Sequence, residues 1–178
     1  MGTVDWTLAF NYGETTVSSI APTPPQLLAS YPVLPVTPGE VAVPQHLYDQ
    51  TAISLLTMAS PKEKLGLGAL WTYGDFVVNL RETIYGPTKQ LVSRNGGGYY
   101  TEEVSTAGIT DLEIDYSFTD MIGLAIGANN LFDQNPETVK ALNATQLEDG
   151  SNVVGAPLGI SPYGINGGFY YGRVTFKF

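Results

Sequence analysis

The residues best suited to chemistry in this sequence are acidic side chains spaced two positions apart. Asp111, Glu113 and Asp115 follow this spacing, which places side chains on one face of a β-strand. Charged groups gathered on one face of a sheet pair with one another or line a water-filled space. We interpret them as part of a polar wall that guides a hydrated solute, the alternative being that they only keep that face wet. The wall residues predicted in this way are Arg81, Asp111, Glu113, Asp115 and Arg173.

Catalytic and metal-binding patterns are absent from the sequence. His46 is the only histidine, so any nucleophile–histidine–carboxylate triad must use it, and no nucleophile elbow surrounds it. The sequence contains no cysteine, which excludes disulfides, cysteine-ligated zinc and thiol catalysis. No EF-type calcium loop occurs. We therefore expect no enzyme activity, no catalytic residue, no bound metal and no cofactor.

Composition limits the remaining classes of function. The 178 residues are enough for one domain with a core. Eight Lys and Arg against 17 Asp and Glu give a net charge of −9, which argues against nucleic-acid binding because that needs a basic surface. Only 14% of the residues are charged, well under the roughly 25% of soluble domains. No apolar run approaches the ~18 residues that a transmembrane helix needs.

Apolar and polar residues alternate with a period of two over most of the sequence, which predicts β-strands. One face of each predicted strand carries Leu, Ile, Val and aromatic residues, and the other carries Gly, Asn, Thr and charged residues. Six segments follow this pattern: 3–12, 64–73, 76–85, 111–118, 122–129 and 170–178.

Two short turns set the register between neighbouring strands. A two-residue turn at Gly74 and Asp75 places apolar residues opposite apolar residues along both strands, apart from Leu67 opposite Glu82. Glycine in the first position of such a turn favours type II′. The next turn must contain three residues, 119–121, because a two-residue turn would mix the two faces.

The short turns alternate with long connections at about 18–62, 86–107 and 132–166. A transmembrane barrel has this asymmetry, with short periplasmic turns and long extracellular loops. Nine residues at ~3.3 Å rise and ~40° tilt cover roughly 23 Å, close to the ~25 Å apolar band of such barrels. Aromatic residues lie at the ends of the predicted strands, as interfacial girdles do: Trp71, Tyr73, Phe76, Tyr116, Phe118, Phe176 and Phe178.

The long connections hold the candidate ligand-binding residues. The 18–62 connection is rich in proline, which lacks an N–H group and cannot lie inside a sheet, so we expect an extended extracellular loop. Aromatic rings and an arginine in outer loops suit stacking on a small ligand, although mobile loop tips account for them equally well. The candidates are Tyr31, Tyr48, Arg94, Tyr99 and Tyr100.

Two segments carry a family resemblance. Residues 126–133, Ile-Gly-Ala-Asn-Asn-Leu-Phe-Asp, resemble the penultimate-strand motif of TonB-dependent outer-membrane receptors, and residues 170–178 resemble the last strand of that family. The motif residues are Asn129, Asn130, Leu131, Phe132 and Asp133, and the C-terminal β-signal residues are Tyr170, Val174, Phe176 and Phe178.

The resemblance implies the fold, the location and the partners. The family has a plug domain inside a 22-stranded antiparallel barrel, and residues 1–178 correspond to its last six strands, without the plug and the earlier strands. It implies energised uptake of a scarce solute, such as a siderophore–iron complex, cobalamin or an oligosaccharide, across the bacterial outer membrane. Its partners are membrane lipid, the plug, the TonB energy complex and the solute, and its C-terminal strand is recognised during membrane assembly.

Two other interpretations remain open on the sequence. The first is a complete small outer-membrane barrel of eight strands, two of them within 40–60, that acts as a passive pore or adhesin. The second is a soluble β-sandwich that binds carbohydrate through its tyrosines, with the apolar face packed against a second sheet.

Overall fold

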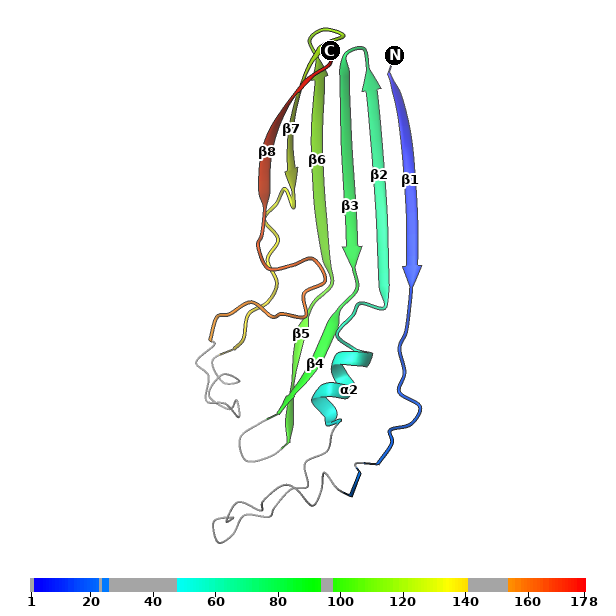
Figure 1. Ribbon diagram of the computed structural model, residues 1–178, viewed down its shortest axis with the longest axis vertical. Coiled ribbons are helices and arrows are strands. Elements are labelled where there is room, and N and C mark those ends of the chain that lie inside the picture. The colour runs from blue at the N-terminus through cyan, green and yellow to red at the C-terminus, as the bar shows by residue number, and fades with distance from the viewer. Residues whose placement is uncertain (1, 23, 26–47, 94–97, 141–153) are drawn as a thin grey trace.

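A computed structural model describes residues 2–22, 24–25, 48–93, 98–140 and 154–178. Six long strands form one antiparallel sheet in the order β1-β2-β3-β6-β7-β8, shown edge to edge in Figure 1. They are β1 (Thr3–Tyr12), β2 (Glu63–Tyr73), β3 (Phe76–Tyr85), β6 (Ala107–Ser117), β7 (Ile122–Asn129) and β8 (Phe169–Phe176). All six strands predicted from the alternating pattern are therefore confirmed.

The turns confirm the predicted register. Tyr73 lies opposite Phe76, and Leu67 lies opposite Glu82. Gly74 has φ +55°, as the first position of a type II′ turn requires. At the second turn, the Phe118 N–H donates to the carbonyl of Ile122 at 3.0 Å, which leaves three residues between them.

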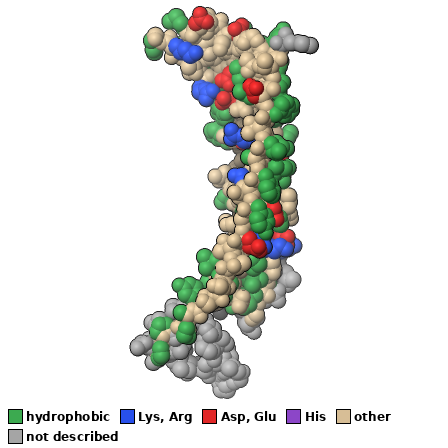
Figure 2. All heavy atoms as spheres, turned by 90° about the vertical axis from the view of Figure 1, so that its right-hand side faces the viewer, with side chains coloured by type: hydrophobic (Ala, Val, Ile, Leu, Met, Phe, Trp, Pro, Cys, Tyr) green, Lys and Arg blue, Asp and Glu red, His purple; other side chains and the backbone are tan. Residues whose placement is uncertain are grey.

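Each side of the sheet has its own character. The apolar face carries the residues at alternate positions that include Trp6, Leu8, Phe10, Ile126 and Val174, and they are 55–79% exposed. Figure 2 shows hydrophobic side chains along one side of the sheet and lysine and arginine on the other over most of its length. In the described part of the chain no second sheet covers the apolar face. A soluble sandwich requires such a cover, so the structure does not support that alternative.

The outer connections contain structure that the sequence pattern did not predict. They hold a helix, α2 (Gln50–Thr57), and a separate hairpin of β4 (Thr88–Ser93) and β5 (Tyr99–Val104). The helix occupies the region in which the eight-stranded alternative needs strands. Asp49 caps it by accepting a hydrogen bond from the Ala52 N–H at 2.8 Å, a common N-cap arrangement. The described part of the chain contains no helix whose length and apolar character would let it cross a membrane.

These outer elements pack into a small body with its own core. Val104, Leu158 and Ile160 are buried together, although 54 residues or more separate the first from the others. The hydroxyl of Thr88 donates to the carbonyl of Ile160 at 2.9 Å, and the Leu91 N–H donates to the Ser54 hydroxyl at 2.9 Å. We call α2, β4, β5 and residues 154–163 the outer body. In Figure 1 it lies at the end of the sheet opposite the chain termini.

We expect Val104→Ala to lower the free energy of unfolding of the outer body by about 2 kcal/mol, because Val104 is fully buried and the change leaves a cavity. Hydrogen exchange of the β4 and β5 amides measures this loss. Thr101→Ala, at an exposed position of the same strand, is the control and is expected to change stability by under about 0.5 kcal/mol. Equal protection in Val104→Ala and the parent would contradict the packing described here.

Candidate functional site

The polar face of the sheet brings all five predicted wall residues to one side. This face comprises the strand positions that alternate with the apolar face. Arg81 on β3 lies opposite Asp111 on β6, and Asp115 on β6 lies opposite Ala125 on β7. Arg173 on β8 lies opposite the same Ala125.

Two side chains of β8 reach across β7 to β6. The Tyr171 hydroxyl donates to Oε2 of Glu113 at 2.7 Å. Nη2 of Arg173 donates to Oε1 of Glu113 at 3.1 Å and to Oδ1 of Asp115 at 3.2 Å. We call these four residues the clasp. The clasp links β6 and β8, two strands that are not neighbours in the sheet. Its hydrogen bonds involve charged groups and are therefore stronger than hydrogen bonds between neutral groups.

The clasp depends on small residues in β7. Gly127 lies between Glu113 and Tyr171, and Ala125 lies between Asp115 and Arg173. A Cβ atom at Gly127 would lie 2.5 Å from the Tyr171 ring, well inside contact distance. Glycine weakens a strand unless another group approaches closely, and here the tyrosine ring does. The alternating pattern predicted the face of these residues, but it gave no signal that they pair across a strand.

The motif residues tie the end of β7 to its neighbours. Asn130 is buried with φ +54°, a conformation that asparagine tolerates better than most residues. Its side chain donates to the Gln134 carbonyl and accepts from the Gln134 N–H, both at 2.8 Å. Its own N–H donates to Oδ1 of Asp111 at 2.9 Å. The Asp111 carboxylate therefore stabilises the turn that begins at Asn130.

The other motif residues continue the same arrangement. Asp133 also has a positive φ, +55°, and its Oδ1 accepts a hydrogen bond from the Gly168 N–H at 2.7 Å. The Leu131 carbonyl accepts from the Tyr170 hydroxyl at 3.0 Å. Asn129 and Phe132 are not buried. The motif thus holds the start and the end of the long β7–β8 connection together.

We expect Asn130→Ala to lower the free energy of unfolding by about 3 kcal/mol. The change removes two hydrogen bonds of a buried side chain and puts alanine in a left-handed conformation. Asn130→Gly removes the same bonds without the conformational strain and is expected to cost about 1 kcal/mol less. Urea unfolding of the lipid-embedded protein measures both variants. Asn129→Ala, at the exposed neighbour, is the control, and a cost equal to that of Asn130→Ala would contradict this role.

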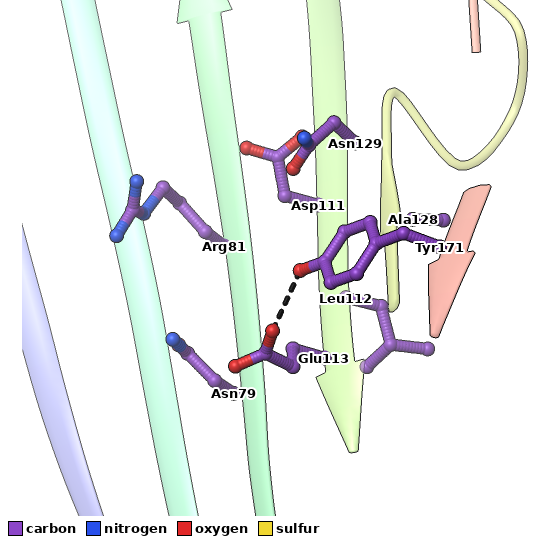
Figure 3. A pocket seen from close by; sticks show the side chains of 8 residues that line it. All are labelled: Asn79, Arg81, Asp111, Leu112, Glu113, Ala128, Asn129 and Tyr171. Atoms are coloured by element: carbon purple, nitrogen blue, oxygen red, sulfur yellow. Dashed lines mark hydrogen bonds between the residues drawn. The ribbon is translucent and has the colours of Figure 1, made fainter. Parts of the chain in front are cut away.

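Two hollows meet at Arg81 on the polar face, and the first of them adjoins the clasp. The first, about 170 Å³, is lined by Arg81, Asp111, Glu113 and Tyr171 among others, as Figure 3 shows. The second, about 260 Å³, lies over β1 and β2. Arg81 and Asn79 border both. In the described residues no group of three or more histidine or acidic side chains is placed to hold a metal ion.

The predicted outer-loop residues are only partly described. Tyr48, just before α2, and Tyr99 on β5 are exposed, whereas the Tyr100 side chain is buried. Of the adjacent pair, only Tyr99 is therefore presented to the solvent. Tyr31 and Arg94 lie outside the described residues, as does most of the proline-rich segment of the 18–62 connection.

Two carboxyl groups outside the strands, those of Glu14 and Glu137, have pKa values below the ordinary value. A hydrogen bond and the charge of Lys62 lower the pKa of the Glu14 carboxyl, and Glu14 raises the pKa of Lys62 in return. Burial raises the pKa of Glu137, but hydrogen bonds from Ser105 outweigh it and the pKa falls below its ordinary value. Both carboxylates are thus held in the charged form beside the loops.

The register places the acidic residue Glu82 on the apolar face. Glu82 lies opposite Leu67 and Thr110, near the outer end of β3. The Thr110 hydroxyl donates to its carboxylate, which lowers the cost of placing a charge there.

Comparison with known proteins supports the fold. No family model and no curated protein matches the chain. The pyoverdine outer membrane receptor FpvA from Pseudomonas aeruginosa PAO1 is similar in structure, with a TM-score of 0.50 and 16% identity over 69% of this chain and 16% of that one. A mutant of the ferric enterobactin receptor PfeA from the same species matches with a TM-score of 0.47 and 18% identity over 73% of this chain and 18% of the receptor.

The FpvA match and the form of the sheet itself both support the fold. The chain spans under a fifth of the length of these receptors. Its sheet is antiparallel throughout and consists of long strands, as a piece of a barrel wall requires. The chain has the fold of part of the β-barrel of TonB-dependent outer-membrane receptors.

Proposed function

We propose that residues 1–178 form the last six strands of the barrel of a TonB-dependent outer-membrane receptor that takes up a scarce solute. The observation that supports this most is the sheet with an uncovered apolar face and an internally paired polar face. An apolar surface of this extent is a membrane- or partner-binding surface in a stable protein. Hydrocarbon would contact the apolar face and water the polar face.

The location and partners follow from this proposal. The barrel spans the bacterial outer membrane, a plug domain fills its lumen, and the TonB complex supplies energy. The outer body with its exposed Tyr99, and the exposed Tyr48 just before α2, face the cell exterior and contact the solute before it enters. FpvA is named as a pyoverdine receptor, so among siderophore–iron, cobalamin and oligosaccharide we would test siderophore–iron first. We propose no catalytic activity.

Thiol labelling in intact cells tests the orientation. The chain contains no cysteine, so Thr101→Cys in the outer body and Asp75→Cys in a short turn each add one thiol to it. The full-length protein is used, with any cysteine elsewhere replaced by serine. A membrane-impermeant maleimide is expected to label the Thr101→Cys variant in intact cells. The same reagent is expected to label the Asp75→Cys variant only after the outer membrane is permeabilised.

Two results would contradict the proposal, one from the labelling and one from the behaviour of the purified protein. Equal labelling of both variants in intact cells contradicts a membrane-spanning sheet, and so does a protein that is monomeric and cooperatively folded without detergent. The solute is tested separately, by measuring the uptake of radioactive iron supplied as a siderophore complex in cells with and without the gene.

A further inference from the structure

Arg81 is the arginine of the polar face that the described residues leave uncommitted. It makes no hydrogen bond or ion pair within the part of the chain that the structure describes. Asp111 lies directly opposite it on β6, yet that carboxylate accepts the Asn130 N–H. Arg173, by contrast, is bound by two carboxylates. The two arginines therefore lie on the same face, but among the described residues only Arg173 is paired with carboxylates.

The other acidic groups near Arg81 are also engaged. Glu113 accepts hydrogen bonds from Tyr171 and Arg173, and Asp115 accepts one from Arg173. In Figure 3 the guanidinium of Arg81 extends away from the Asp111 and Glu113 carboxylates. The positive charge of Arg81 consequently faces open space.

The open space beside Arg81 is a hollow over two glycines of β2. Gly66 and Gly68 of β2 have no side chains to fill the surface, and the resulting hollow of about 260 Å³ reaches from β1 to Arg81. That volume suits a group of side-chain size, since one water molecule occupies about 30 Å³. Asn79 stands beside Arg81 on the same face of β3 and adds an amide donor. A guanidinium and an amide at one margin of a hollow match the two oxygens of a carboxylate.

We propose that Arg81, with Asn79, binds a carboxylate in the hollow over Gly66 and Gly68. One uncommitted positive charge favours a monoanion, because a phosphate dianion would bring a second negative charge close to Asp111 and Glu113. The carboxylate belongs either to an acidic side chain from another part of the full-length protein or to the solute. The inference rests on the proposed function only in that the polar face must border an enclosed, water-filled space.

Arginine side-chain NMR tests the site in the full-length protein in detergent. This chain contains three arginines, Arg81, Arg94 and Arg173, and Arg81→Lys assigns the Arg81 Nε–H signal. The probe is N-acetylglutamate α-amide, which carries one carboxylate, and the control is N-acetylglutamine α-amide, which carries none. Arg173 supplies the reference for an arginine already paired with carboxylates.

Two results support the proposal and identify the source of the carboxylate. A signal that moves saturably with N-acetylglutamate α-amide but not with N-acetylglutamine α-amide indicates a site open to the solute, and Arg81→Lys is then expected to weaken probe affinity about tenfold because the planar fork is lost. A signal that resembles that of Arg173 and ignores the probe indicates an acidic side chain of the protein.

A signal at the position of free arginine that does not respond saturably overturns the site. If the protein still passes the thiol-labelling test, only the carboxylate site has failed. If the labelling fails, the barrel assignment fails whatever Arg81 does. The labelling in intact cells and the NMR of the purified protein therefore distinguish failure of one proposal from failure of the other.

Discussion

Replacing Phe176 and Phe178 together by serine in the full-length protein is expected to lower its amount in the outer membrane sharply. Phe176 continues the apolar row of Val174 on β8, and both phenylalanines are exposed. Each phenylalanine buried in lipid contributes roughly 1.5–3 kcal/mol, and serine adds a hydroxyl that hydrocarbon cannot satisfy. The resemblance to the family's C-terminal β-signal predicts the same result through recognition during assembly.

The matched control lies on the other face of the same strand. Thr175 and Lys177 alternate with the two phenylalanines, and replacing both by serine removes side chains of the polar face only. Outer-membrane fractionation with quantitative immunoblotting measures each variant. Insertion of the phenylalanine double variant at the level of this control would show that the apolar row of β8 is not needed.

Gly127→Ala is expected to lower the free energy of unfolding by about 2 kcal/mol, although alanine is ordinarily better than glycine in a strand. The added methyl group would displace the Tyr171 ring and break its hydrogen bond to Glu113, and a hydrogen bond to a charged group is worth roughly 1.5–3 kcal/mol. Urea unfolding of the protein in lipid vesicles measures the change.

The clasp predicts a change of sign in a second background. In Tyr171→Ala protein the ring is gone, so Gly127→Ala is expected to stabilise the sheet by about 0.5 kcal/mol. Gly123 is the control, because a Cβ there meets only an ordinary contact of 3.7 Å with the Tyr116 carbonyl. The same cost for Gly127→Ala in both backgrounds would contradict the clasp, since the cycle isolates the coupling between the two positions.

The clasp also explains how the register of the last three strands is specified. The polar face of β7 carries Gly123, Ala125 and Gly127 before it ends at Asn129, and strands with such small residues specify register weakly. Tyr171 and Arg173 reach their partners on β6 only in the observed alignment. Sliding β8 by two residues in either direction would move Tyr171 away from its position opposite Gly127 and so away from Glu113.

The sequence by itself determined the six-stranded sheet, the contents of each face and the register at both short turns. Alternation and turn length are local properties, so Gly74 and the three-residue turn at 119–121 could be placed without any knowledge of distant contacts. The sequence also singled out Asn130 and Asp133 through a family motif, but not the hydrogen bonds that these residues make.

Only the tertiary structure decided which charged residues are paired and which is not. Arg81 and Arg173 look equivalent in an alternating pattern, yet Arg173 pairs with Glu113, 60 positions earlier in the sequence, whereas Arg81 pairs with no described residue. The outer body was missed for the same reason, because Thr88 and Ile160 are 72 residues apart. Contacts of this kind depend on how the whole chain folds in space, and local periodicity carries no record of them.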